Sequence, residues 1–139
     1  MCPRCIFQSE TERDITVDDI NELKYLYQCV CETGRITPSS GIIGRKIDFE
    51  LDLCGYTIPA GITCCISPFY IMRDPAHYDN PEKYDPEHFA PDKVKNRDPF
   101  AYVPFSAGIR NCIGNRFANL ELVVTLAHIL RRYRVISMI

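Results

Sequence analysis

The sequence predicts part of a mainly helical domain, with two principal helices, a small antiparallel β unit and a long, ordered, proline-rich loop. Apolar residues recur at helical spacing after Thr16 and again after Asn115. Apolar and acidic residues alternate between Ile47 and Leu53, as in a half-exposed strand. Prolines are so frequent in residues 74–104 that neither one long helix nor a central strand can form there.

The composition indicates an ordinary globular chain. It has 139 residues, of which 46% are hydrophobic and 24% charged, so a disordered tail or a fibrous repeat is excluded. The net charge is −2 and no Lys/Arg block occurs, so we expect no nucleic-acid partner. No apolar run is long enough to predict a membrane span. The eight cysteines follow no signal peptide, which favours reduced thiols in an intracellular setting.

Two segments are expected: an irregular N-terminal stretch over residues 1–15 and one partial domain over residues 16–139. Cys2 and Cys5 form a lone CxxC motif in the first segment. A structural zinc site would need a second pair of ligands at matching spacing, and the other cysteines do not provide one. We therefore favour free thiols over zinc.

The first principal helix should begin at Thr16, because a hydroxyl followed three residues later by Asp19 resembles a capping box. We expect the helix to reach about Arg35, with a possible break near residues 22–25, and to end before Pro38. Four apolar residues define its buried face: Ile20, Leu23, Tyr27 and Val30.

The β unit should contain three strands, at residues 47–53, 56–58 and 62–67. Turns are predicted at Cys54-Gly55 and at residues 59–61. The long proline-rich segment that follows is acceptable inside a compact domain only if it wraps around something, such as a partner, a cofactor or a neighbouring domain.

The last helix should run from Asn115 to about Tyr133. Its apolar stripe would consist of Phe117, Leu120, Val124, Ala127 and Leu130. The other sides of the helix are largely apolar too, which predicts burial on most sides. We expect the rest of this chain to cover it only in part.

The segment from Phe105 to Gly114 places Cys112 in a glycine-flanked loop just before that helix. A thiolate there would be stabilised by unpaired N–H groups and by the helix dipole. Gly108 and Gly114 would let the backbone approach a flat ligand closely. Arg110 could pair with a carboxylate of that ligand, and Phe105 could shield the sulfur from water.

This loop resembles the haem-ligand signature of the cytochrome P450 superfamily. The matching residues are Phe105, Gly108, Arg110, Cys112 and Gly114, followed by Phe117, Ala118 and Glu121. The resemblance implies that Cys112 is the axial ligand of the iron of haem b and that the fold is the C-terminal portion of the mainly-α P450 fold. Segments 22–26, 43–46, 55–61 and 101–106 look most like family 4, the fatty-acid hydroxylases and their arthropod relatives.

The resemblance also implies a buried structural network that holds the loop. Glu32 and Arg35 fit the family's Glu-x-x-Arg motif, and i, i+3 spacing puts them on one helix face. His88 stands where an arginine usually joins this pair, and a neutral imidazole lacks the guanidinium fork. Arg45 would reach a haem propionate. Gly34 stands where leucine is common in the family. We expect these departures to indicate a relaxed or divergent copy with a weakened network.

The implied activity is that of a haem-thiolate monooxygenase. It would insert one oxygen atom of O2 into a fatty-acid-like or other lipophilic substrate, with electrons from NADPH through NADPH-cytochrome P450 reductase. No residue of this chain is assigned a catalytic role with certainty. A basic patch for the reductase could comprise Arg116, Arg131, Arg132 and Arg134, although these could equally be a solvated helix face.

Family resemblance implies a location on the cytosolic face of the endoplasmic reticulum membrane, through an N-terminal anchor that we do not find here. Because the family's chains are several times longer, we expect a fragment that is inactive alone. The alternative is a non-catalytic truncated or partial product that binds haem weakly or not at all.

Overall fold

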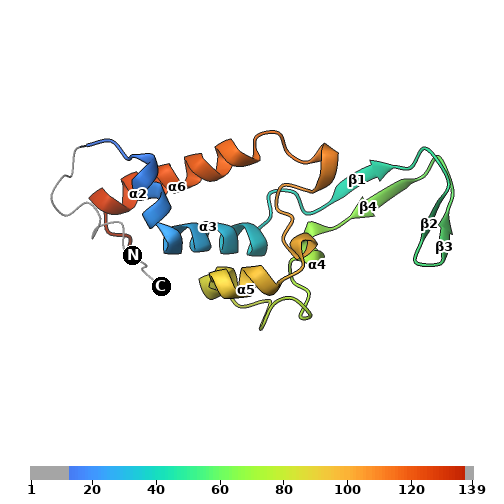
Figure 1. The fold of residues 1–139 in the computed structure, drawn as a ribbon, viewed down its shortest axis with the longest axis horizontal. Coiled ribbons are helices and arrows are strands. Elements are labelled where there is room, and N and C mark those ends of the chain that lie inside the picture. The colour runs from blue at the N-terminus through green and yellow to red at the C-terminus, as the bar shows by residue number, and fades with distance from the viewer. Residues whose placement is uncertain (1–12, 137–139) are drawn as a thin grey trace.

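The computed structural model describes residues 13–136, and its helices gather at one end while a β arm projects from the other (Figure 1). The α-helices are α2 (Val17–Glu22), α3 (Lys24–Ile36), α4 (Pro68–Ile71), α5 (Pro91–Asn96) and α6 (Asn115–Arg132). The strands are β1 (Ile43–Lys46), β2 (Leu51–Leu53), β3 (Tyr56–Ile58) and β4 (Thr63–Ile66). Three short 3₁₀ helices are η1 (Pro86–Phe89), η2 (Pro99–Ala101) and η3 (Gly108–Arg110). Cys2, Cys5 and most of the predicted irregular segment lie outside the described residues.

The predicted start of the first helical region is confirmed. The Asp19 N–H donates to Thr16 Oγ1 (3.3 Å), and the Thr16 N–H donates to Asp19 Oδ2 (2.9 Å), which completes a capping box. Both Arg13 amino groups bind the same carboxylate, at 2.6 and 2.8 Å. The predicted break also occurs, because Leu23 leaves helical geometry (φ −82°, ψ 41°) and separates α2 from α3.

The hydrophobic core lies where α2 and α3 cross α6. Leu23, Leu26 and Val30 pack there against Val123 and Ala127. The buried face of α6 is therefore rotated from the predicted stripe, in which Phe117 and Leu120 instead remain exposed. One reason is that α3 contacts α6 from one side only, and an apolar groove of about 520 Å³ opens between the two helices.

The β arm consists of two nested antiparallel pairs rather than one three-stranded unit. β1 pairs with β4, with Ile43 opposite Ile66, and the β2–β3 hairpin lies at the far end of the arm (Figure 1). Of the strand predicted at residues 47–53, only β2 forms. The first strand, β1, was not predicted, because its sequence Ile-Gly-Arg-Lys has no apolar alternation.

The proline-rich segment is ordered and lies against α3. It contains the short elements η1, α5 and η2, each with a proline in its first turn, where the missing N–H costs nothing. α5 was not predicted. Long-range hydrogen bonds anchor the segment: Gln28 Nε2 donates to Phe89 O (3.3 Å), and Tyr78 Oη donates to Ala101 O (3.0 Å). This proline-rich segment therefore packs against α3 of the same chain.

Within residues 13–136, no helix has both the length and the apolarity needed to cross a membrane.

The cap at Thr16 allows a test of the fold. Thr16→Ala removes the hydroxyl that accepts the Asp19 N–H, so the free energy of unfolding should fall by about 1 kcal/mol. Thr16→Ser keeps that acceptor and is the matched control. Chemical denaturation followed by circular dichroism measures both, and equal stability of the two variants would contradict the assigned cap.

Candidate functional site

Cys112 lies in an exposed loop three residues before the start of α6. Its own N–H donates to Phe105 O (2.9 Å), which closes the loop into a compact turn. Gly108 begins η3 with φ +79°, a left-handed conformation that favours glycine. A side chain at Gly114 would lie 3.9 Å from Cys112 Sγ, in ordinary contact. The glycine spacing therefore shapes the loop itself.

Large apolar side chains that lie near Cys112 in the sequence are exposed. Ile109 and Ile113 are fully exposed, and Phe117 on the first turn of α6 is exposed over 70% of its surface. We call these three exposed side chains, all within five residues of Cys112 in the sequence, the apolar platform. Phe105 is instead partly buried and lines the groove between α3 and α6.

Arg45 joins the β arm to this loop. Its Nη2 donates to Ser106 Oγ (3.0 Å) and to Arg110 O (3.4 Å). Ser106 has φ +64°, which is uncommon for a residue with a side chain, so the contact with Arg45 helps to hold it there. The structure thus brings Arg45 and Arg110 together, although 64 residues separate them in the chain. Ser106 was not predicted, and its residue type gave no signal.

These residues fit haem. Cys112 and the apolar platform are both exposed, and exposed apolar surface suits a flat apolar ring. The Arg45 guanidinium reaches the backbone carbonyl of Arg110, and guanidinium groups pair with carboxylates such as propionates. The individual ligand and propionate roles predicted for Cys112, Arg45, Arg110, Phe105, Gly108 and Gly114 stay predictions.

The buried centre of the molecule is an ion pair on α3. Arg35 Nε and Nη2 bind the two Glu32 oxygens, both at 2.8 Å, and neither side chain is exposed. The guanidinium also donates to three backbone carbonyls of the segment that follows α4: Met72 O (3.0 Å), Pro81 O (2.6 Å) and Lys83 O (3.1 Å). These five hydrogen bonds, to four residues, need the planar fork of arginine.

His88 lies in the same network. Its Nδ1 is 3.1 Å from Glu32 Oε1, and the Asp85 N–H donates to that same oxygen (2.8 Å). Burial raises the pKa of Glu32, but hydrogen bonds from Arg35, Asp85 and His88 outweigh it and leave this pKa below its ordinary value. The structure thus brings Glu32, Arg35 and His88 together, whereas the sequence predicted a weakened third contact.

Gly34 allows a close contact that the sequence did not reveal. A Cβ there would lie 3.3 Å from Tyr102 Oη, which donates to Cys31 O (3.1 Å). Burial raises the pKa of the Tyr102 hydroxyl far above its ordinary value, so it remains a donor. Tyr102 lies three residues before Phe105 and therefore ties the start of the Cys112 loop to α3.

The predicted basic patch divides into two parts. Arg131 is buried, donates to Arg13 O (2.7 Å) and contacts His128 Nδ1 (2.9 Å), so its inclusion in a docking patch was wrong. Arg116 is exposed at the start of α6, while Arg132 is exposed at its end, about 24 Å away along the helix axis. Only Arg116 lies near Cys112 in the chain.

The buried ion pair is the most sensitive point for mutation. Arg35→Lys leaves Glu32 with one point charge in place of the fork and leaves three carbonyls short of donors. We expect a loss of about 3 kcal/mol or more in the free energy of unfolding, measured by chemical denaturation. The control is Lys46→Gln, which breaks an exposed pair with Asp48 and should change stability by less than about 1 kcal/mol. Equal effects would contradict the assigned importance of Arg35.

Nearly the whole chain is similar in sequence to known proteins. The family model for cytochrome P450 matches residues 7–138. Cytochrome P450 4c21 of Blattella germanica is 46% identical over 129 residues, which cover 93% of this chain and 26% of that protein. Probable cytochrome P450 4aa1 of Drosophila melanogaster is 38% identical over 138 residues (96% and 27%), and cytochrome P450 4V2 of Homo sapiens is 40% identical over 124 residues (89% and 24%). The chain thus spans about a quarter of the length of these relatives. Since the family model covers nearly all of it, the chain belongs to the cytochrome P450 family.

Proposed function

We propose that this chain carries the haem-binding part of a haem-thiolate monooxygenase, with Cys112 as the axial ligand of the iron. One observation carries the proposal above all: Cys112 is exposed on a loop that also carries the exposed Ile109 and Ile113, and the Arg45 guanidinium binds this loop at the Arg110 carbonyl. Family membership supports haem as the group that this loop receives.

The residues of the loop would each have a separate task. Ile109, Ile113 and Phe117 would lose exposed apolar surface against the ring, which stabilises the bound state by the hydrophobic effect. Arg45 and Arg110 would pair with its carboxylates. The hydrogen bond from the Cys112 N–H to Phe105 O would fix the direction of the thiol. When bound, the haem iron with a thiolate ligand would supply the activation of dioxygen and the oxidation itself.

The substrate and partners of the complete enzyme are the finer part of the proposal. We propose a lipophilic, fatty-acid-like substrate and electrons from NADPH through NADPH-cytochrome P450 reductase, at the endoplasmic reticulum membrane. The matches to several family 4 relatives support this choice of class. For the reductase, the exposed Arg116 near Cys112 is a better candidate than the distant end of α6.

A non-catalytic product remains the second candidate for the 139-residue polypeptide by itself. The exposed platform favours it, because none of the described residues covers Ile109 or Ile113 and excludes water from that side of Cys112.

Thiolate ligation can be tested by spectroscopy. The chain is mixed with haem, reduced and exposed to carbon monoxide, and a strongly red-shifted Soret band is expected because thiolate donates electron density to the iron. Cys112→Ala should abolish the band. Cys65→Ala removes another exposed thiol, on β4, and should leave it unchanged. Persistence of the band in Cys112→Ala would overturn the assignment.

Activity of the polypeptide alone is a separate question. We predict no monooxygenase turnover when haem, reductase, NADPH and a fatty acid are supplied, because the apolar platform is open to water. Product is measured by mass spectrometry, with a full-length family 4 enzyme as the positive control. Clear turnover would refute this prediction without affecting the ligand assignment.

A further inference from the structure

The β2–β3 hairpin has one apolar face and one polar face. Successive side chains of a strand point to opposite faces, and directly opposite residues of an antiparallel pair share a face. The register pairs the apolar residues of β2 with those of β3, while Asp52 lies opposite Thr57 on the other face. The four residues of the apolar face are Leu51, Leu53, Tyr56 and Ile58.

This apolar face is open to solvent. Tyr56 is 77% exposed and Leu53 is 54% exposed, while Leu51 and Ile58 are partly buried. Phe49, two residues before β2, is 67% exposed. Large apolar side chains gathered on one exposed face mark a contact site.

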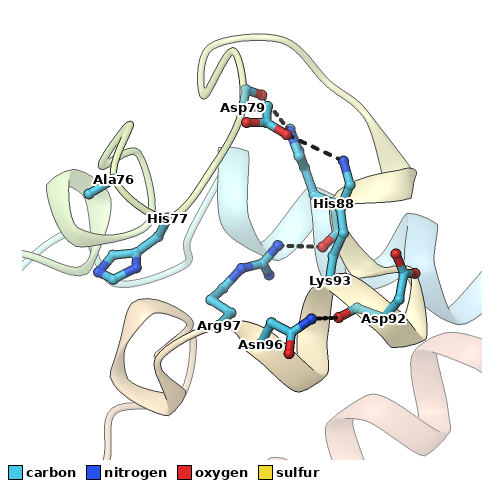
Figure 2. Close-up of a pocket in the computed structure, with 8 residues that line it drawn as sticks. All are labelled: Ala76, His77, Asp79, His88, Asp92, Lys93, Asn96 and Arg97. Carbon is cyan, nitrogen blue, oxygen red and sulfur yellow. Dashed lines mark hydrogen bonds and ion pairs between the residues drawn. The ribbon is translucent and has the colours of Figure 1, made fainter.

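The position of the hairpin suits contact with a broad, flat surface. Figure 1 shows β2 and β3 at the far end of the β arm, away from the helices. The turn between them has only two residues, Cys54 and Gly55, with φ +53° and +83°, so the tip is narrow. The pocket beside α5, on the helical side of the molecule, is instead lined mainly by polar and charged side chains (Figure 2). The arm thus presents its apolar face at a protruding tip.

Charges on the arm limit what can cover this face. Three exposed carboxylates flank it, those of Asp48, Glu50 and Asp52, and Lys46 already pairs with Asp48 (3.4 Å). A second copy of the hairpin would bring the same carboxylates together, and like charges repel. A bilayer of zwitterionic lipids presents ammonium groups at its surface and apolar chains beneath them, so it matches both the carboxylates and the apolar face.

We propose that the apolar face of the β2–β3 hairpin contacts a lipid bilayer of zwitterionic composition. This inference rests on the membrane location proposed above and names a surface of the chain that touches the lipid. The backbone limits the depth of contact, because β2 and β3 form a two-stranded sheet whose outer edges have unpaired N–H and C=O groups. Such groups do not enter the hydrocarbon core, so the hairpin lies in the headgroup region, where tyrosine is favoured.

A single introduced tryptophan tests this contact, because the chain contains no tryptophan of its own. Tyr56→Trp reports on the apolar face, and Thr57→Trp, the next residue, is the matched control on the opposite face. Each 139-residue variant is mixed with phosphatidylcholine vesicles, with and without lipids brominated near the headgroup, which quench tryptophan at short range. The emission of Tyr56→Trp should shift to the blue and be quenched, and that of Thr57→Trp should change much less.

The local readout separates this contact from lipid binding through other exposed apolar side chains, such as Phe117. Equal quenching at the two positions, or no quenching of Tyr56→Trp, would overturn the proposal. A blue shift of Tyr56→Trp that grows with protein concentration in the absence of vesicles would indicate a second copy and would overturn it too.

Two further arms test the chemistry of the contact. Leu53→Asp in the Tyr56→Trp background should abolish quenching while circular dichroism stays unchanged, and phosphatidylserine in the vesicles should reduce it. Quenching that survives Leu53→Asp, or that rises with phosphatidylserine, would contradict the assigned face or its charge preference. The carbon monoxide spectrum needs no vesicles, so failure of the lipid contact leaves the assignment of Cys112 untouched.

Discussion

The Arg35 guanidinium is the contact on which the arrangement of this chain depends. A buried charge is costly, and the geometry around it must satisfy nearly every donor for the network to be tolerated. Here Glu32 takes two donors, and the carbonyls of Met72, Pro81 and Lys83 take the rest. Because those carbonyls belong to a segment with little regular structure, Arg35 provides the order that hydrogen bonding between strands would provide elsewhere.

Two sets of hydrogen bonds hold the Cys112 loop. On one side, Tyr78 Oη binds Ala101 O and Tyr102 Oη binds Cys31 O, which fixes the chain just before Phe105. On the other side, Arg45 binds the loop from the β arm at Ser106 and Arg110. The loop is thus held at its beginning and its middle, and α6 holds its end. An exposed thiol can keep a fixed direction only if its loop is restrained in this way.

Sequence reasoning succeeded where the determinants are local. The Thr16 cap and the two helical regions depend on neighbours within four residues, and the dense motif around Cys112 identified the family. It failed where contacts between segments far apart in the sequence determine the strand pairing or the buried face of a helix. The strand β1 gains its partner from β4 across the arm, and the buried face of α6 is chosen by α3. Tyr102 has no sequence signal at all, since its role exists only because α3 passes beside it.

The departures at positions 34 and 88 first suggested a relaxed copy, and the structure gives each of them a physical reason. Glycine inside α3 costs about 1 kcal/mol relative to alanine, but it leaves the space in which the Tyr102 hydroxyl reaches Cys31 O. Histidine at position 88 loses the guanidinium fork, yet both of its ring nitrogens have acceptors and its own carbonyl binds Arg97. A copy under no constraint would leave such buried polar groups without partners. Both residues instead have partners that fit them, so the scaffold around Glu32 accommodates glycine at position 34 and histidine at position 88.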